Sequence, residues 1–132
     1  MHELWKVTPV TQAYFALIAE DTSDIAGLMQ MTLTRLGVDS HHALNGVLAL
    51  EFLSERLPDI LLLDIGMPGM NGYDLALALR SLPEYRDVPL IAVTGFSIYD
   101  DRGRALECGF NAHLTKPINP MTLLDLIKSL RD

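Results

Sequence analysis

The sequence predicts an alternating α/β domain built on one doubly wound, five-stranded parallel sheet. Short apolar runs recur along the chain, segments with helical spacing of apolar residues separate them, and the two kinds alternate over about 120 residues. Apolar runs of this length suit strands covered on both faces, and their alternation with helices is typical of parallel sheets. The length of 132 residues suits one domain, and an apolar content of 49% supplies a core.

Five short segments are the predicted strands. The three strongest runs extend from Phe15 to Ala19, from Ile60 to Leu63 and from Leu90 to Val93. Weaker runs extend from Val38 to Ala43 and from Ala112 to Leu114. Each is short enough for a strand and too short for a typical helix.

Five further segments are the predicted helices. In the first, apolar residues repeat at intervals of three and four from Ile25 to Leu36, and Gly37 then ends the pattern as a C-terminal cap. The others are predicted from Val47 to Leu57 before Pro58, from Leu75 to Leu82 before Pro83, from Asp100 to Cys108 before Gly109, and from Leu123 to Leu130 after Pro120.

Charge and composition exclude several classes of protein. The net charge is 10 − 17 = −7, so a nucleic-acid partner is not expected. No apolar stretch approaches the roughly 20 residues that span a bilayer, and residues 13–19 lack the flanks of a signal peptide. Cys108 is the only cysteine, which favours a reducing, cytoplasmic location. Residues 1–12 show no period and are interpreted as a tail or linker, with the domain spanning residues 13–132.

Polar residues follow four of the five predicted strands, at the edge where ligands bind in open α/β sheets. Glu20 and Asp21 follow the first strand, Asp64 the third, Thr94 the fourth and Lys116 the fifth. Each has a simpler alternative: Asp21 as a helix cap, Asp64 as a turn cap, Thr94 as an ordinary strand residue and Lys116 as a surface lysine. Their shared position at four strand ends favours a common site.

Crowded carboxylates repel one another unless a cation lies among them, and Mg²⁺ is suited to carboxylate and phosphate oxygens. The backbone carbonyl of Gly66 is a candidate for a further ligand. With Lys116 and Thr94 available to stabilise a phosphoryl group, Asp64 can act as a nucleophile and form an acyl phosphate.

At these residues the sequence resembles the receiver domains of two-component response regulators. The resemblance rests on Glu20-Asp21, on "LLLDIGMPGMNG" around Asp64, on "VTG" at Thr94 and on the Lys116-Pro117 pair, and it extends from about Phe15 to Leu130. It implies a flavodoxin-like (βα)5 fold and a cis bond before Pro117. "LIAVTGF" and "DRGRALECGFNAHLTKPI" are most similar to receivers fused to hybrid sensor kinases, and the stand-alone and fused contexts both stay open.

The resemblance also implies roles for individual residues. Asp64 would accept phosphate from a histidine kinase or a histidine phosphotransfer domain, and Glu20, Asp21, Asp64 and the Gly66 carbonyl would bind Mg²⁺. Thr94 would move toward the phosphate and Lys116 would pair with it. A downstream protein would then read the face formed by the fourth helix, fifth strand and fifth helix.

Three positions depart from the family pattern. His113 stands where an aromatic switch residue is usual, and both a switch role and an ordinary edge-strand histidine are consistent with it. Gly95 follows Thr94 where alanine is commoner, and Phe96 lies on the same loop.

Two other functional classes compete with the signalling switch. An aspartyl-phosphate phosphatase or phosphotransferase is one, although such enzymes commonly carry a second acid two residues after the nucleophile, where this chain has Gly66. A phosphate-independent interaction module is the other, although the acids and the lysine are all present. We therefore expect phosphoryl acceptance and slow autodephosphorylation rather than enzymatic turnover.

Overall fold

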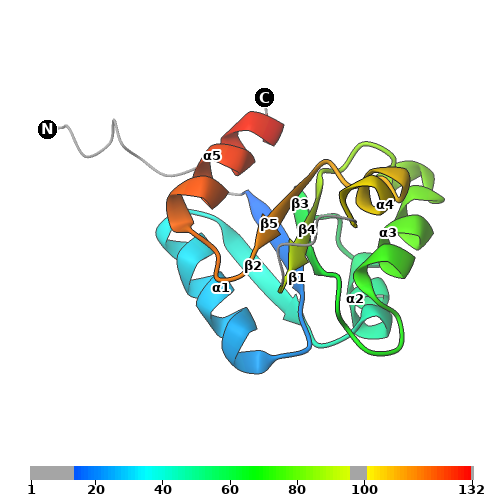
Figure 1. Cartoon of the computed structure of the whole chain (residues 1–132), viewed down its shortest axis with the longest axis horizontal. Coiled ribbons are helices and arrows are strands. Elements are labelled where there is room, and N and C mark those ends of the chain that lie inside the picture. Colours follow the sequence, from blue (N-terminus) through cyan, green and yellow to red (C-terminus); the bar gives the residue numbers. More distant parts are fainter. Residues whose placement is uncertain (1–13, 96–100, 132) are drawn as a thin grey trace, which may run out of the picture.

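The computed structural model describes residues 14–95 and 101–131, in which a twisted sheet lies between two layers of helices (Figure 1). The predicted tail at residues 1–12 and the loop residue Phe96 lie outside the described residues. Among the described helices, none is long and apolar enough to cross a membrane.

The sheet contains the five predicted strands, all parallel, in the order β2-β1-β3-β4-β5. Their bounds are β1 (Phe15–Ala19), β2 (Asp39–Ala43), β3 (Ile60–Asp64), β4 (Leu90–Thr94) and β5 (Ala112–Thr115). The prediction of a doubly wound sheet is therefore confirmed, and strand ends differ from the predicted ones by at most one residue.

All five predicted helices are present, together with one 3₁₀ turn. They are α1 (Ser23–Arg35), α2 (Gly46–Leu53), α3 (Gly72–Arg80), η2 (Pro83–Tyr85), α4 (Asp101–Glu107) and α5 (Pro120–Arg131). Gly37 and Gly109 have φ values of 83° and 98°, the left-handed conformation expected just after α1 and α4.

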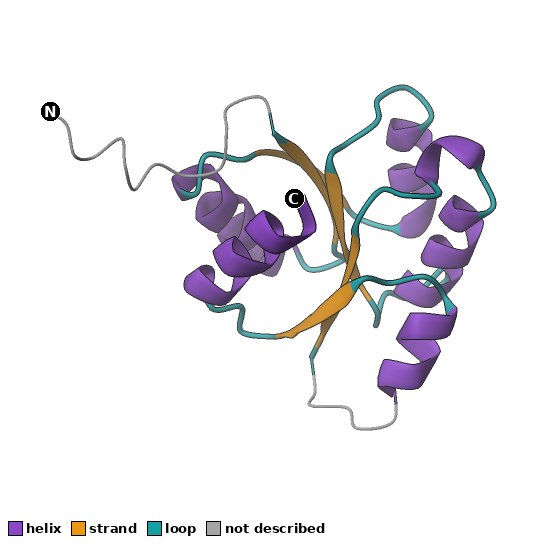
Figure 2. Ribbon diagram, turned by 90° about the horizontal axis from the view of Figure 1, so that it is seen from above, coloured by secondary structure: helices purple, strands orange, loops and turns teal. Residues whose placement is uncertain are grey.

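Figure 2 shows helices on both faces of the sheet, and each face has a separate hydrophobic core. On one face, Met29 and Leu33 of α1 and Leu123 and Ile127 of α5 pack against alternate strand residues. On the other face, α2, α3 and α4 bury their apolar sides. Because β1, β3 and β4 are covered on both faces, every residue in these strands is buried.

Two helices end two or more residues earlier than predicted. The second ends at Leu53 rather than at Leu57, and Leu57 is 55% exposed. Its buried face is Gly46, Ala49 and Leu53, whereas Val47, the first apolar residue of the predicted helix, is 57% exposed. An almost wholly apolar helix has little periodic contrast, so its sequence does not reveal which side faces the sheet.

The third helix ends at Arg80 rather than at Leu82. Its capping box, formed by Asn71 and Asp74, sets its beginning, and Pro83 opens the separate turn η2 after it. A proline disfavours helical backbone at the preceding residue. The apolar spacing therefore extends to Leu82, although the helix ends at Arg80.

The chain winds outward in both directions from β1 and β3, which are neighbours in the sheet. Ala19 of β1 pairs with Leu63 of β3, so the residues that follow, Glu20 and Asp64, reach the same edge side by side. In open parallel sheets, ligands bind where the winding direction reverses. The predicted site therefore lies at the position that the topology favours.

Candidate functional site

Three carboxylates meet at the carboxyl edge of the sheet. Glu20, Asp21 and Asp64 each offer an oxygen, and these oxygens lie within 4.8 Å of one another. Glu20 and Asp64 are buried, whereas Asp21 is exposed. The capping alternative for Asp21 does not hold, because Thr22 is the N-cap residue of α1.

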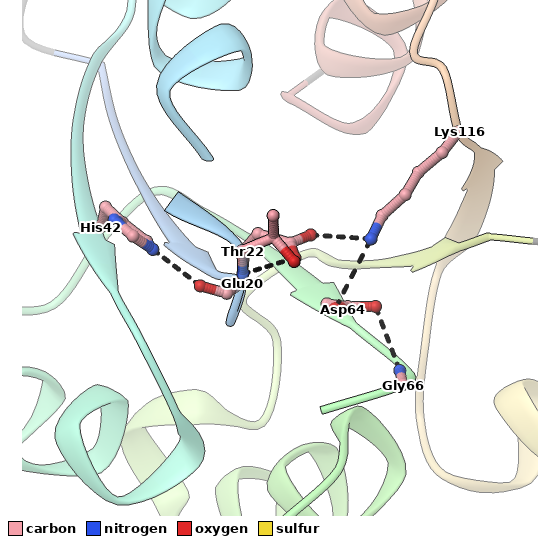
Figure 3. Close-up of polar contacts among 6 residues, drawn as sticks. All are labelled: Glu20, Thr22, His42, Asp64, Gly66 and Lys116. Atoms are coloured by element: carbon pink, nitrogen blue, oxygen red, sulfur yellow. Dashed lines mark hydrogen bonds and ion pairs between the residues drawn. The ribbon is translucent and has the colours of Figure 1, made fainter. Parts of the chain in front are cut away.

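Glu20 is held by contacts on both its backbone and its side chain (Figure 3). Its N–H donates to the Ala43 carbonyl at 3.1 Å, and its carboxylate Oε2 accepts from the Thr22 N–H at 3.1 Å. The other carboxylate oxygen, Oε1, is also buried. Its contact is an ion pair with the ammonium of Lys116, at 2.9 Å.

Asp64 ends β3 and points into the same cluster. Its Oδ1 accepts a hydrogen bond from the Gly66 N–H at 3.0 Å, so the turn-capping role is real, and its Oδ2 lies 3.5 Å from the Lys116 ammonium. Burial raises the pKa of Asp64 to about 6, and the charge of Glu20 adds to the rise, while the Gly66 bond and Lys116 oppose it. The ionised form of Asp64 is therefore poorly stabilised by the protein alone.

Lys116 comes from the segment after β5 and bridges two acids that lie far from it in sequence (Figure 3). Burial by itself would lower the pKa of its ammonium group, but the contact with Glu20 and the charge of Asp64 outweigh burial and raise it. The Lys116–Pro117 bond is cis, as the resemblance implied. Lys116 is not a free surface lysine.

Thr94 is the last residue of β4 and is buried. Its carbonyl accepts from the Lys116 N–H at 2.7 Å, so the backbones of Thr94 and Lys116 are joined at the site edge. Gly66 lies two residues beyond Asp64, and a side chain added there would meet only Asp64 Oδ1, at 3.8 Å.

His113 lies on β5, opposite Ala92 of β4, and is half-buried. It lines a cavity of about 190 Å³ between β5 and α4, together with Leu106 and Phe110.

Two residues near the site, His42 and Gly72, were not among the predicted site residues. His42 of β2 is half-buried and places its ring Nε2 at 2.7 Å from the Glu20 carbonyl oxygen. A side chain at Gly72 would approach the Asp64 carbonyl oxygen to 2.7 Å, so α3 can begin there only with glycine. The alternation of side chains along a strand does place His42 on the face of Glu20, but it does not reveal the contact.

The acidic cluster fits a hard divalent cation. Three carboxylate oxygens lie close together, Glu20 and Asp64 are buried, and burial disfavours the charge on Asp64. Oxygen ligands of this kind are those that Mg²⁺ takes.

Comparisons with known proteins agree with this geometry. The profile of the response regulator receiver domain family matches residues 16–128. The sensor histidine kinase CheAY of Helicobacter pylori is 35% identical over 117 residues, which are 87% of this chain and 15% of CheAY. The chain therefore spans a small part of that relative.

Two solved structures have the same fold. The signal receiver domain of a histidine kinase from Syntrophus aciditrophicus is 36% identical, with a TM-score of 0.82 and 90% of each chain covered. The receiver domain of the sensor histidine kinase PA1611 from Pseudomonas aeruginosa, which has a magnesium ion coordinated in its active-site cleft, is 25% identical. Its TM-score is also 0.82, over 89% of this chain and 97% of that domain.

Receiver domains are phosphoacceptor signalling switches rather than conventional enzymes. They bind Mg²⁺ at an acidic pocket, and they interact with histidine kinases or phosphotransfer proteins and with downstream effectors. The match covers most of the chain, and the acids and the lysine meet at the expected edge of the sheet. This chain therefore belongs to the response regulator receiver domain family.

Proposed function

We propose that Asp64 accepts a phosphoryl group from the phosphohistidine of a partner histidine kinase or histidine phosphotransfer domain. The observation that carries this proposal is the position of Asp64, at the edge where the sheet reverses its winding, between two acids and a lysine. Family membership supports the same role.

The transfer is an in-line displacement at phosphorus. A carboxylate oxygen of Asp64 forms the new P–O bond while the P–N bond to the donor imidazole breaks, and the electron pair of that bond stays on the ring nitrogen. The products are an acyl phosphate at Asp64 and a neutral histidine on the donor. No general base is needed, because the attacking group is a carboxylate.

Glu20, Asp21, Asp64 and the backbone carbonyl of Gly66 would hold Mg²⁺. When bound, this ion neutralises charge on the phosphoryl oxygens as they approach the acidic cluster. The ammonium of Lys116, already 3.5 Å from Asp64, would contribute further positive charge to the phosphoryl group. It also offsets the mutual repulsion of Glu20 and Asp64 before the reaction.

The switch follows from the new charge at Asp64. Thr94, joined through its backbone to Lys116, would donate a hydrogen bond from its hydroxyl to the phosphoryl group. His113 would change its position in the cavity beside α4. The partner-binding face on α4, β5 and α5 is then altered by a shift in population between two states. The single reduced cysteine, Cys108, fits a cytoplasmic setting for this exchange.

The test is labelling of Asp64 by a small phosphodonor. The wild-type chain treated with acetyl phosphate and Mg²⁺ should gain the mass of one phosphoryl group, and the Asp64→Asn variant should gain none. Asp125→Asn, which changes an exposed acid on α5, is the matched control and should be labelled like wild type. Stoichiometric labelling of Asp64→Asn would refute the assignment of the nucleophile.

A further inference from the structure

His42 lies outside the set of residues assigned above, yet it contacts the site directly. Its Nε2 lies 2.7 Å from the carbonyl oxygen of Glu20 (Figure 3). A carbonyl oxygen only accepts hydrogen bonds, so the ring nitrogen must carry the hydrogen and donate it. The structure thus assigns His42 a ring in which Nε2 is protonated.

This bond takes the place of a backbone hydrogen bond between β1 and β2. The Glu20 N–H still donates to the Ala43 carbonyl, in the pattern of the β1–β2 ladder. Strand β2 ends at Ala43, and the chain then turns into α2 at Gly46. The carbonyl of Glu20, the residue just after β1, accepts its hydrogen bond from the His42 side chain of β2 instead.

The bonded carbonyl belongs to the peptide that joins Glu20 and Asp21, the two acids that follow β1. That peptide is planar, so fixing its oxygen fixes the direction in which the chain continues to Asp21. The Glu20 carboxylate is held separately by the Thr22 N–H and Lys116. Among these contacts, His42 is the one that acts on the backbone between Glu20 and Asp21.

We propose that His42 is a positioning residue: it holds the Glu20–Asp21 peptide so that both carboxylates face Asp64, and it thereby sets the affinity of the cluster for Mg²⁺. The inference rests on the proposed function of this cluster and deepens it. Residues that orient metal ligands typically change metal affinity by about 10- to 100-fold when they are removed.

The same strand offers a matched control. His41 is the neighbouring histidine, but its ring stacks on Phe52 of α2, with centroids 3.9 Å apart and an angle of 8°. It is exposed and lies on the opposite face of the sheet from His42. Replacement of His41 removes an imidazole from β2 without touching the Glu20 carbonyl.

The experiment measures Mg²⁺ binding by calorimetric titration of the wild type and of three variants at pH 7.5, under conditions where each is folded by circular dichroism. His42→Leu should bind Mg²⁺ about 10-fold more weakly. His41→Leu should stay within about twofold of wild type. His42→Gln, whose amide can donate from a position similar to that of Nε2, should recover most of the loss.

Two outcomes overturn the proposal. One is wild-type affinity in His42→Leu, and the other is equal weakening in the Gln and Leu variants, because the donated hydrogen bond would then not be the cause. Nitrogen chemical shifts of the ring test it without any variant. A hydrogen on Nε2 that exchanges slowly with water supports the bond, and a ring protonated only on Nδ1 contradicts it.

These results are separable from the proposed function. If the wild type binds Mg²⁺ but acetyl phosphate does not label Asp64, the phosphoacceptor role fails while the His42 series still gives its answer. If Asp64 is labelled and Mg²⁺ affinity is indifferent to His42, only the positioning role fails.

Discussion

At the scale of single residues, the carboxylates of the site differ in their surroundings. Asp21 is exposed, whereas Asp64 is 5% exposed and lies beside a second buried acid, Glu20. Burial raises the pKa of Asp64 to about 6, above the ordinary value of 3.8. The ionised nucleophile therefore destabilises the metal-free fold, and a bound cation or an incoming phosphoryl group can relieve that cost.

This cost predicts a pH dependence. Because the pKa of Asp64 is raised in the folded state, its contribution to stability is greatest below pH 3.8 and falls as the pH rises through about 6. In EDTA, the stability of Asp64→Asn relative to wild type should increase by about 1 kcal/mol between pH 5 and pH 7.5. Urea unfolding at the two pH values measures this difference. Asp125→Asn should show no such change, and a pH-independent difference for Asp64→Asn would contradict the raised pKa.

At the scale of elements, one arginine joins three segments on the far side of the sheet from α1. Arg80, at the end of α3, donates hydrogen bonds of 2.6 to 3.1 Å to carbonyl oxygens before β4 and after α4, and to the Asn111 side chain. Asn111 Oδ1 also accepts from the Leu90 N–H at the start of β4. The flat guanidinium thus satisfies carbonyls of two loops that have few partners of their own.

Loss of this contact should destabilise the whole domain. We expect Arg80→Lys to reduce the free energy of unfolding by about 2–4 kcal/mol, because an ammonium group cannot reach both loops and leaves carbonyls unpaired. Arg86→Lys, at an exposed position in the same region, should change it by less than about 0.5 kcal/mol. Urea unfolding compares the two variants, and equal midpoints would show that the two loops do not depend on Arg80.

At the scale of the whole molecule, the site opens beside an apolar groove. The groove has a volume of about 410 Å³ between α1 and the segment that follows β5, and it is lined by Ile25, Leu28, Met29, Thr32, Lys116, Pro117 and Ile118. Lys116 belongs both to this groove and to the acidic cluster, so a protein that delivers phosphate to Asp64 must pass close to it. Leu28, on the rim, is 64% exposed.

If the donor protein docks at this groove during the proposed phosphoryl transfer, the Leu28 side chain lies in its contact surface. Leu28→Asp should slow transfer by about 10-fold or more, because a charge on an apolar contact surface must be desolvated when a partner binds. The donor used in this assay is chosen from a panel of phosphorylated histidine phosphotransfer domains, as the one that transfers phosphate to the wild-type chain fastest. Labelling by acetyl phosphate should be unchanged, since this small donor needs no docking surface.

Leu77→Asp is the matched control, because Leu77 is 53% exposed on α3 and outside the groove. It should transfer at the wild-type rate. Equal transfer rates in the two variants would place the docking surface elsewhere.

The order of strands and helices and the identity of the strand-end residues were readable from the sequence. Apolar runs and helical spacing are local, and the rule that parallel strands present their carboxyl ends at one edge then brings Glu20, Asp64 and Lys116 together without any coordinates. Where local contrast is weak, as in α2, the sequence predicted the helix but only part of its buried face: Leu53 is buried, whereas Val47 is exposed.

Contacts between distant side chains were decided by tertiary structure alone. Three examples are the ion pair of Lys116 with Glu20, the bond from His42 to the Glu20 carbonyl, and the Arg80 contacts. They join residues that lie 22 to 96 positions apart or belong to separate loops. They depend on strand register and on where each chain segment turns, and no local pattern encodes either. The raised pKa of Asp64 has the same origin, because burial and a neighbouring acid act on it only after the sheet has assembled.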